Sequence, residues 1–133
     1  MELKFKELQI KKIDTPAFTM SPVELKEYID FSVKRIYFVS QPRGERKTGA
    51  HCHKQEEEMF ILAQGSATAV IDRGRGPEEF KMVAPQSALL VGAYVWHHFK
   101  EMSKDAILLA LSSTNYNPDR SDYIEDYREY LKL

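Results

Sequence analysis

The most restrictive feature of the sequence is a series of short apolar segments that are separated by turn residues. Each segment is rich in β-branched or aromatic residues, a composition typical of strands. The segments are residues 32–40, 58–65, 66–74, 78–84, 87–99 and 106–113. Glycine- and proline-containing stretches such as QPRGERKTG and RGRGP fit the turns between them. Many short strands with turns between them predict an antiparallel sandwich or barrel.

The two ends of the chain carry the remaining expected elements. Residues 2–13 alternate charged and apolar residues and predict a first strand. A short helix is predicted from Ser21, because Ser21 can cap it and Glu24 completes a capping box. Residues 117–133 predict a C-terminal helix whose tyrosines pack against the sheet. We therefore expect an all-β fold with a short N-terminal helix and a C-terminal helix, in a single domain over residues 1–133.

Composition and charge narrow the class of protein. A chain of 133 residues with 43% hydrophobic and 29% charged residues is typical of a globular protein. Its 19 basic and 20 acidic residues give a net charge of −1, which does not favour a nucleic-acid or membrane partner. The single cysteine, Cys52, cannot form an internal disulfide, and no apolar run reaches membrane-spanning length. The sequence therefore predicts a cytoplasmic protein.

Two histidines that lie one residue apart are the strongest candidates for a functional site. On a strand, His51 and His53 share one face and Cys52 points to the other. Glu58 follows in the next predicted strand, and His97 ends the later tract VGAYVWH. Three imidazoles and a carboxylate suit zinc, iron, manganese or nickel, so a divalent transition metal is one interpretation. Alternatively, the two histidines form no functional site and are simply exposed residues of a strand.

The spacing of these residues resembles the two motifs of the cupin superfamily, which are small β-barrels with a site in the barrel mouth. The first motif is matched by HxH, four residues, Glu58, six residues and Gly65. The second is matched only at His97, because Gly92 and Tyr94 stand where Pro and Gly are usual. The resemblance implies a cupin-type antiparallel β-barrel, or jelly roll.

A closer resemblance covers roughly residues 31–133. The stretches SVKRIYFV, GAHCHK, GSATAVID, YVWH and DYIEDYREYLK are similar to those of the dTDP-4-keto-6-deoxyglucose 3,4-ketoisomerases, the WxcM-like sugar isomerases. The resemblance implies an intramolecular oxidoreductase that moves a carbonyl from C4 to C3 of a nucleotide-linked hexose without a cofactor. It also implies a homodimer and a product that is used for amino sugars of bacterial surface polysaccharides or antibiotics.

The resemblance also implies roles for individual residues. His51 is the expected base and His53 the second acid/base group. Tyr37 is expected to supply a phenolic donor or to relay protons, and Arg35 to meet an oxyanion or a phosphate.

Further substrate contacts are expected from Arg46, Glu58, Tyr94, Trp96 and His97. The chain departs from the family at Thr48, where Arg is usual, so that Arg46 is the nearest substitute. It departs again at Glu58, where relatives usually carry Gln. Its acidic neighbours Glu56 and Glu57 are expected to be solvated.

Two other functions remain open. A metal-dependent cupin enzyme, either a dioxygenase or a metal-assisted isomerase, would use His51, His53, Glu58 and His97 as ligands. A cupin that only binds a small molecule would keep the barrel without its chemistry.

Overall fold

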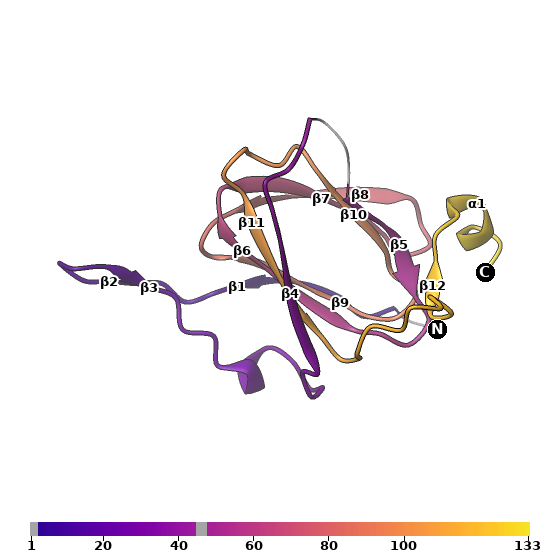
Figure 1. The fold of residues 1–133 in the computed structure, drawn as a ribbon, viewed down its shortest axis with the longest axis horizontal. Coiled ribbons are helices and arrows are strands. Elements are labelled where there is room, and N and C mark those ends of the chain that lie inside the picture. The colour runs from indigo at the N-terminus through magenta and orange to yellow at the C-terminus, as the bar shows by residue number, and fades with distance from the viewer. Residues whose placement is uncertain (1–2, 45–47) are drawn as a thin grey trace.

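Two five-stranded antiparallel sheets face each other and form a barrel-like body (Figure 1). The structure is a computed structural model that describes residues 3–44 and 48–133. In spatial order, the strands of the first sheet are β1 (Phe5–Gln9), β9 (Ser87–Val91), β6 (Glu58–Gln64), β11 (Ile107–Ser112) and β4 (Arg35–Ser40). The strands of the second are β12 (Tyr123–Ile124), β5 (Thr48–His53), β10 (Trp96–Lys100), β7 (Ser66–Asp72) and β8 (Pro77–Val83). The expected all-β architecture is confirmed.

Alternation along β6 divides its side chains between the interior of the barrel and an outer face. Phe60 and Leu62 point into the core between the sheets, whereas Met59 and Ile61 pack on the outer face of the first sheet. Glu58 shares the inner face with Phe60 and lies one step nearer the start of the strand. It therefore stands where the apolar core gives way to polar side chains.

The N-terminal region is less regular than predicted. The strand expected over residues 2–13 is confirmed only in part, because β1 ends at Gln9. A separate hairpin of β2 (Ile13–Asp14) and β3 (Thr19–Met20) follows it and projects away from the barrel (Figure 1).

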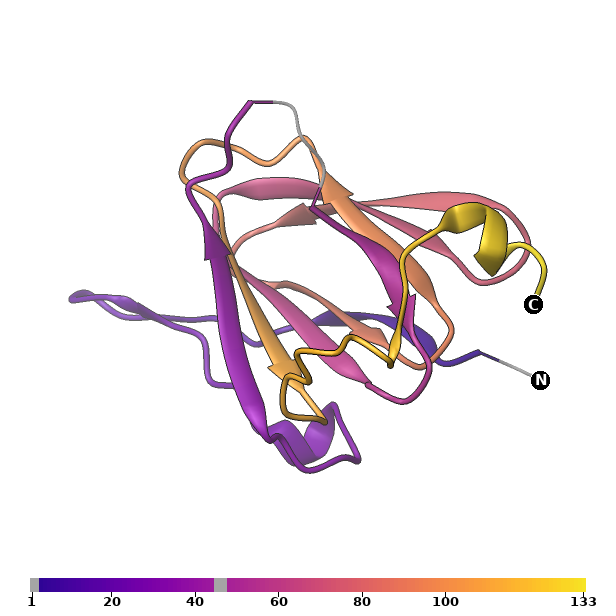
Figure 2. The ribbon, with the colours of Figure 1, turned by 45° about the vertical axis from the view of Figure 1, so that its right-hand side comes forward.

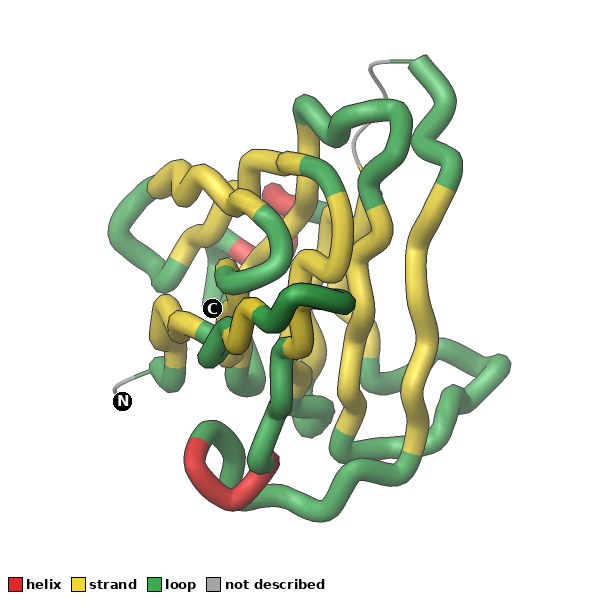
Figure 3. Tube along the Cα trace, turned by 90° about the vertical axis from the view of Figure 1, so that its left-hand side faces the viewer, coloured by secondary structure: helices red, strands yellow, loops and turns green. Residues whose placement is uncertain are grey.

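The short helix predicted from Ser21 is present only as a single 3₁₀ turn, η1 (Leu25–Glu27), which begins later than expected. Glu24 precedes the turn in an extended conformation, and its side chain makes no capping hydrogen bond. Val23 and Ile29 instead pack against the outer face of the first sheet, so tertiary burial outweighs local helix propensity. Helical structure in the described residues is confined to two short pieces (Figure 3). Neither is long and apolar enough to cross a membrane.

The C-terminal segment also differs from the helix predicted over residues 117–133. Its first part forms β12, which pairs with β5 so that Tyr123 lies opposite His53. Only α1 (Tyr127–Tyr130) is helical, and the Asp126 side chain caps it by accepting a hydrogen bond from the Arg128 amide. The C-terminal helix is shorter than predicted because the backbone before α1 pairs with β5.

The tyrosines of this segment pack against the second sheet, as predicted. The rings of Tyr127 and Tyr130 lie 5.2 and 5.4 Å from the Trp96 ring. Tyr130 also donates to the backbone carbonyls of Asp72 and Tyr94, each at 2.9 Å. These contacts fix the C-terminal segment to the outside of the barrel.

Candidate active site

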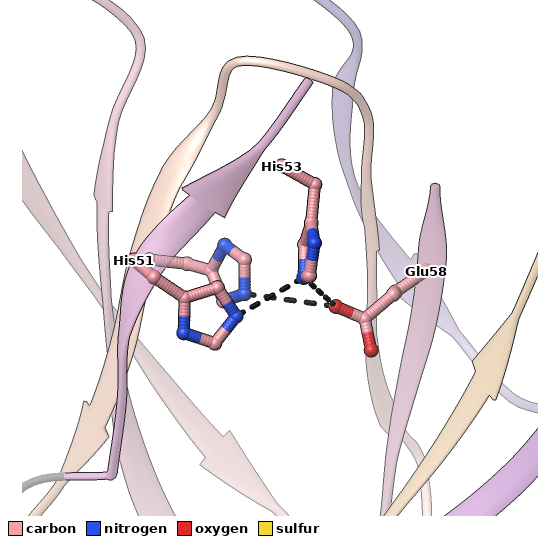
Figure 4. Close-up of side chains that lie close together, drawn as sticks. His51, His53 and Glu58 are labelled. Carbon is pink, nitrogen blue, oxygen red and sulfur yellow. Dashed lines mark hydrogen bonds and ion pairs between the residues drawn. The ribbon is translucent and has the colours of Figure 1, made fainter. Parts of the chain in front are cut away.

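Three histidines and a glutamate meet between the two sheets. His51 and His53 lie on β5, and His97 lies directly opposite His51 on the neighbouring strand β10. Glu58 reaches them from the first sheet (Figure 4). One ligand atom from each of the four side chains lies within 4.8 Å of the others. Cys52 faces the opposite side of β5 and is buried there, as strand alternation predicts.

A cavity of about 450 Å³ opens beside this cluster. Its polar lining comes from both sheets and from the segment after β11. The lining residues are Arg35, Tyr37, Val39, Ala50, His51, Phe60, His97, Phe99, Leu108, Tyr116, Arg120, Tyr123 and Glu125. His53 and Glu58 are not among them, and their side chains are only 3% and 1% exposed. The predicted pair is therefore split, with His51 at the cavity and His53 beneath it.

A chain of close polar contacts joins His51 to Tyr37 beneath the cavity. The Nε2 atoms of His51 and His53 lie 3.0 Å apart, and His53 Nε2 lies 3.3 Å from Glu58 Oε1. The Tyr37 hydroxyl donates to Glu58 Oε2 at 2.5 Å. His97 contributes less, since its Nε2 is 3.8 Å from Glu58 Oε1 and its Nδ1 is 3.0 Å from the Val95 carbonyl.

Carboxylates hold both ring nitrogens of His53. Asp122 Oδ2 lies 3.1 Å from Nδ1, and Glu56 Oε2 lies 2.8 Å from Nε2. Asp122 is itself fixed, because its carboxylate accepts from the backbone amides of Gln55 at 2.7 Å and Glu56 at 3.3 Å. The sequence interpretation missed Asp122; its only signal was its place in the C-terminal DYIEDYREYLK stretch.

The expectation that Glu56 is solvated is wrong, because its side chain is only 3% exposed. Its Oε1 accepts from Ser112 at 2.5 Å, Thr114 at 2.7 Å and Arg35 at 3.1 Å. Glu57, one residue on, pairs instead with Lys4 at 2.8 Å. Glu56 and Glu58 are therefore buried, whereas Glu57 between them points outward. A run of three charged residues in the sequence does not predict this difference.

The environment separates the pKa values of the two paired histidines. Burial, reinforced by the charges of His97, His53 and Arg120, lowers the pKa of His51 to about 2. Burial alone would also lower the pKa of His53, but hydrogen bonds to Glu56 and Glu58 outweigh it and raise this pKa to about 9. At neutral pH the His51 ring is therefore neutral and the His53 ring is an imidazolium.

Burial and hydrogen bonding also shift the pKa values of the neighbouring groups Glu56, Tyr37 and His97. For Glu56, burial would raise the pKa, but hydrogen bonds to His53, Ser112 and Thr114 prevail and lower it to about 2. Burial and the adjacent Glu58 carboxylate raise the pKa of Tyr37 far above its ordinary value, so this side chain remains a phenol. Burial lowers the pKa of His97.

Two of the residues expected to contact the substrate, Trp96 and Tyr94, lie away from the cavity. Trp96 is 6% exposed and packs with Cys52 and Tyr130 outside the barrel, because its neighbour His97 points inward. Tyr94 sits in the turn before β10 and lines a separate pocket beside Tyr130. Neither residue lines the cavity. Arg46 lies outside the described residues.

Residues of the C-terminal segment replace them. After β11 the chain crosses from the first sheet to the second before it forms β12 (Figure 2). The Arg120 guanidinium lies 3.8 Å from the centre of the Tyr123 ring, which in turn lies 4.5 Å from the His53 ring and 4.9 Å from the His51 ring. These residues were missed because the segment was interpreted as a packing helix.

The two-sheet barrel with its histidine cluster is that of a cupin-type enzyme. The family model described as "FdtA: WxcM-like, C-terminal" matches residues 1–133, and the chain belongs to this family. A curated relative, the TDP-4-oxo-6-deoxy-alpha-D-glucose-3,4-oxoisomerase of Aneurinibacillus thermoaerophilus, is 32% identical over 96% of this chain and 90% of its own length.

Solved structures of sugar ketoisomerases show the same fold. A 3,4-ketoisomerase from Helicobacter canadensis superposes with a TM-score of 0.88 at 30% identity, over 98% of this chain and 96% of its own. A double mutant of a 3,4-ketoisomerase from Thermoanaerobacterium thermosaccharolyticum, in complex with TDP, gives a TM-score of 0.88 at 26% identity, over 96% and 91%. The predicted family, cupin-type fold and 3,4-ketoisomerase activity are thereby confirmed.

The charge of His53 generates a prediction about stability. Its folded pKa of about 9 exceeds the ordinary value of 6.5, so protonated His53 stabilises the fold fully below pH 6.5. This contribution is lost as the pH rises through 9. We expect the unfolding free energy, measured by urea titration, to fall over this range in the parent protein and to stay flatter in His53→Gln. Nitrogen-15 NMR that shows a neutral His53 ring at pH 7 would contradict this assignment.

Proposed function

We propose that the cavity is the place where a nucleotide-linked 4-keto-6-deoxyhexose is converted into its 3-keto isomer, with His51 as the base. The single observation that carries this assignment is that His51 and Tyr37 line one cavity and are joined beneath it through His53 and Glu58. The apolar and aromatic remainder of the lining suits a deoxyhexose, which has fewer hydroxyls than an ordinary hexose.

The reaction is an internal transfer of hydrogen. The C4 ketone acidifies the C3–H bond, and the neutral His51 ring removes that proton to give an enediol shared by C3 and C4. The 3-hydroxyl loses its proton as it becomes the new ketone, while C4 receives a proton and its oxygen becomes a hydroxyl. No net oxidation occurs, so the chemistry requires only acids, bases and donors that face the two oxygens.

The surroundings of His51 explain how a weakly basic ring can serve. Without substrate, burial and the His53 charge keep the pKa of His51 low, so the ring is always available as a free base. A bound nucleotide diphosphate and the negative charge that develops on the sugar would raise this pKa during the reaction. Tyr37 remains a phenol and can donate to the developing oxyanion, and His53 supplies positive charge close to the base.

Recognition of the diphosphate is proposed for the two arginines that line the cavity, Arg35 and Arg120. The chain has Thr48 where the family usually has an arginine, and we propose that Arg120 from the C-terminal segment supplies the missing cation. The curated relative acts on a TDP-linked sugar, and we extend that nucleotide to this chain. The product would enter amino-sugar synthesis for surface polysaccharides in the cytoplasm.

We expect catalysis without a metal, but the histidine cluster favours one alternative. The four ligand atoms lie within 4.8 Å of one another, and the buried Glu58 Oε1 faces His53 Nε2 at 3.3 Å and His97 Nε2 at 3.8 Å, so the donor set fits a divalent transition metal. A metal held by His51, His53, Glu58 and His97 would act as a Lewis acid on the substrate oxygens.

The activity is tested with dTDP-4-keto-6-deoxyglucose in deuterated water, followed by NMR. We expect deuterium at C3 or C4 and the appearance of a 3-keto sugar. His51→Asn should lower the rate at least about 100-fold, because the base is lost. Tyr37→Phe should lower kcat about tenfold or more with little change in KM, because its donor acts mainly in the transition state. His98→Asn, on the opposite face of β10 by alternation, is the matched control.

Each alternative has its own outcome in this experiment. A stoichiometric metal that copurifies with the parent protein and is lost in His51→Asn, with activity removed by EDTA, would establish the metal enzyme. Substrate that binds and is recovered without deuterium would establish a binding protein. Parental exchange in His51→Asn would show that another residue is the base.

A homodimer is proposed from the exposed apolar residues of the first sheet and the hairpin. Ile36 and Phe38 are 63% and 66% exposed on the outer face of β4, which is an edge strand. On the projecting hairpin and its loop, Phe18 and Met20 are 59% and 46% exposed. Apolar side chains beside an unpaired strand edge suit a second copy of the same chain.

The dimer is tested by light scattering coupled to gel filtration. We expect the parent protein to elute with twice the mass of the chain, and the double substitution Ile36→Lys and Phe38→Glu to yield a folded monomer. Val83→Lys, which changes an apolar residue that is 63% exposed on β8 of the other sheet, is the control and should remain dimeric. A monomeric parent protein would contradict the proposal.

A further inference from the structure

Glu56 is a buried acidic residue beside the histidine pair, and the reaction described above leaves it without a role. Its side chain is 3% exposed and does not line the cavity. Burying a carboxylate costs several kcal/mol unless polar partners offset the lost hydration. Four partners surround this one, and they are divided between its two oxygens.

One oxygen is held by three donors and the other faces the histidine pair. Oε1 accepts from Ser112, Thr114 and Arg35 at 2.5, 2.7 and 3.1 Å. Oε2 lies 2.8 Å from Nε2 of His53, closer than Glu58 Oε1 at 3.3 Å. The two hydroxyls thus orient the carboxylate, and the carboxylate contacts one residue at each end of the site.

We propose that Glu56 is a positioning residue that ties Arg35 and His53 together, so that one buried carboxylate sets both the anion-binding end and the proton-transfer end of the cavity. The inference rests on the proposed function and adds a residue to that site. Glu56 reaches the substrate only through others, since Arg35 lines the cavity and His53 contacts the base His51 at 3.0 Å.

Glu56 makes two contacts that can be tested separately: the Arg35 arm, through Oε1, and the histidine arm, through Oε2 to His53. Two substitutions separate them. Glu56→Gln keeps a carbonyl that can accept from Ser112, Thr114 and Arg35, but it turns an amide donor toward the Nε2 donor of His53. It should disturb the histidine arm alone. Glu56→Ala removes both arms. Glu57→Gln removes the same charge one residue away, where the side chain pairs with Lys4, and is the matched control.

For Glu56→Gln we expect kcat for isomerisation to fall about tenfold or more, a part of what a general acid or base contributes. The affinity for TDP, measured by calorimetry, should stay within about twofold, because a side chain of the same shape still holds Arg35. Glu56→Ala should lower kcat as well and weaken TDP binding several-fold. A kcat of Glu56→Gln equal to that of Glu57→Gln would overturn the proposal. TDP affinity unchanged in Glu56→Ala would overturn the Arg35 arm.

A double-mutant cycle distinguishes positioning from a general loss of stability. If Glu56 acts through His53, then Glu56→Gln should change kcat less than about twofold in a His53→Asn background. Fully additive losses would show that Glu56 only supports the fold and would overturn the proposal. Failure of the proposed function looks different, because the parent protein itself would then form no 3-keto sugar.

Discussion

The arrangement of the site depends on the buried imidazole of His53, which is held by carboxylates at both ring nitrogens. Asp122 belongs to the C-terminal segment and Glu56 to the loop between β5 and β6, and each accepts hydrogen bonds from other donors. Because both ring nitrogens are held in this way, rotating the His53 ring or removing its proton would break hydrogen bonds and cost free energy. The ring fixes the position of His51 in turn, and it keeps positive charge beneath the place where the proposed substrate develops negative charge.

The fold brings three separate parts of the chain together around His53. The first sheet contributes Tyr37 and Glu58, the second contributes the histidines, and the C-terminal segment contributes Asp122. The segment reaches the site through the pairing of β12 with β5, and α1 is fixed to the outside of the barrel, where Tyr130 donates to the carbonyls of Asp72 and Tyr94. These tyrosine contacts add to the β12–β5 pairing and to the Gln55 and Glu56 amides, which hold Asp122 beside His53.

Much of this could be predicted from the sequence, because strand alternation and motif spacing are local properties. They placed His51 and His53 on one face, turned Cys52 outward and brought Glu58 and His97 to the same cluster. The same rule, applied to Trp96 beside the inward-pointing His97, would have excluded it from the cavity.

The remainder could not be predicted, since it depends on contacts between distant segments. Glu56 and Glu57 are identical residues in one charged run, and the first of them is buried against Ser112 and Thr114, which lie 56 and 58 residues later in the sequence. The segment before α1 has a helix-like pattern, yet pairing with β5 makes it a strand and brings Asp122 and Tyr123 to the histidines. Tertiary hydrogen bonding and burial overrode the local signal in both places.

The central claim is that the sugar reacts in the cavity between His51 and Tyr37. A crystal structure of the His51→Asn variant soaked with dTDP-4-keto-6-deoxyglucose tests it most directly. The account predicts the hexose inside the cavity, with C3 toward residue 51, a sugar oxygen within hydrogen-bond distance of the Tyr37 hydroxyl, and the diphosphate near Arg35 and Arg120. A hexose bound outside this cavity, or one with C3 and C4 turned away from residue 51, would contradict it.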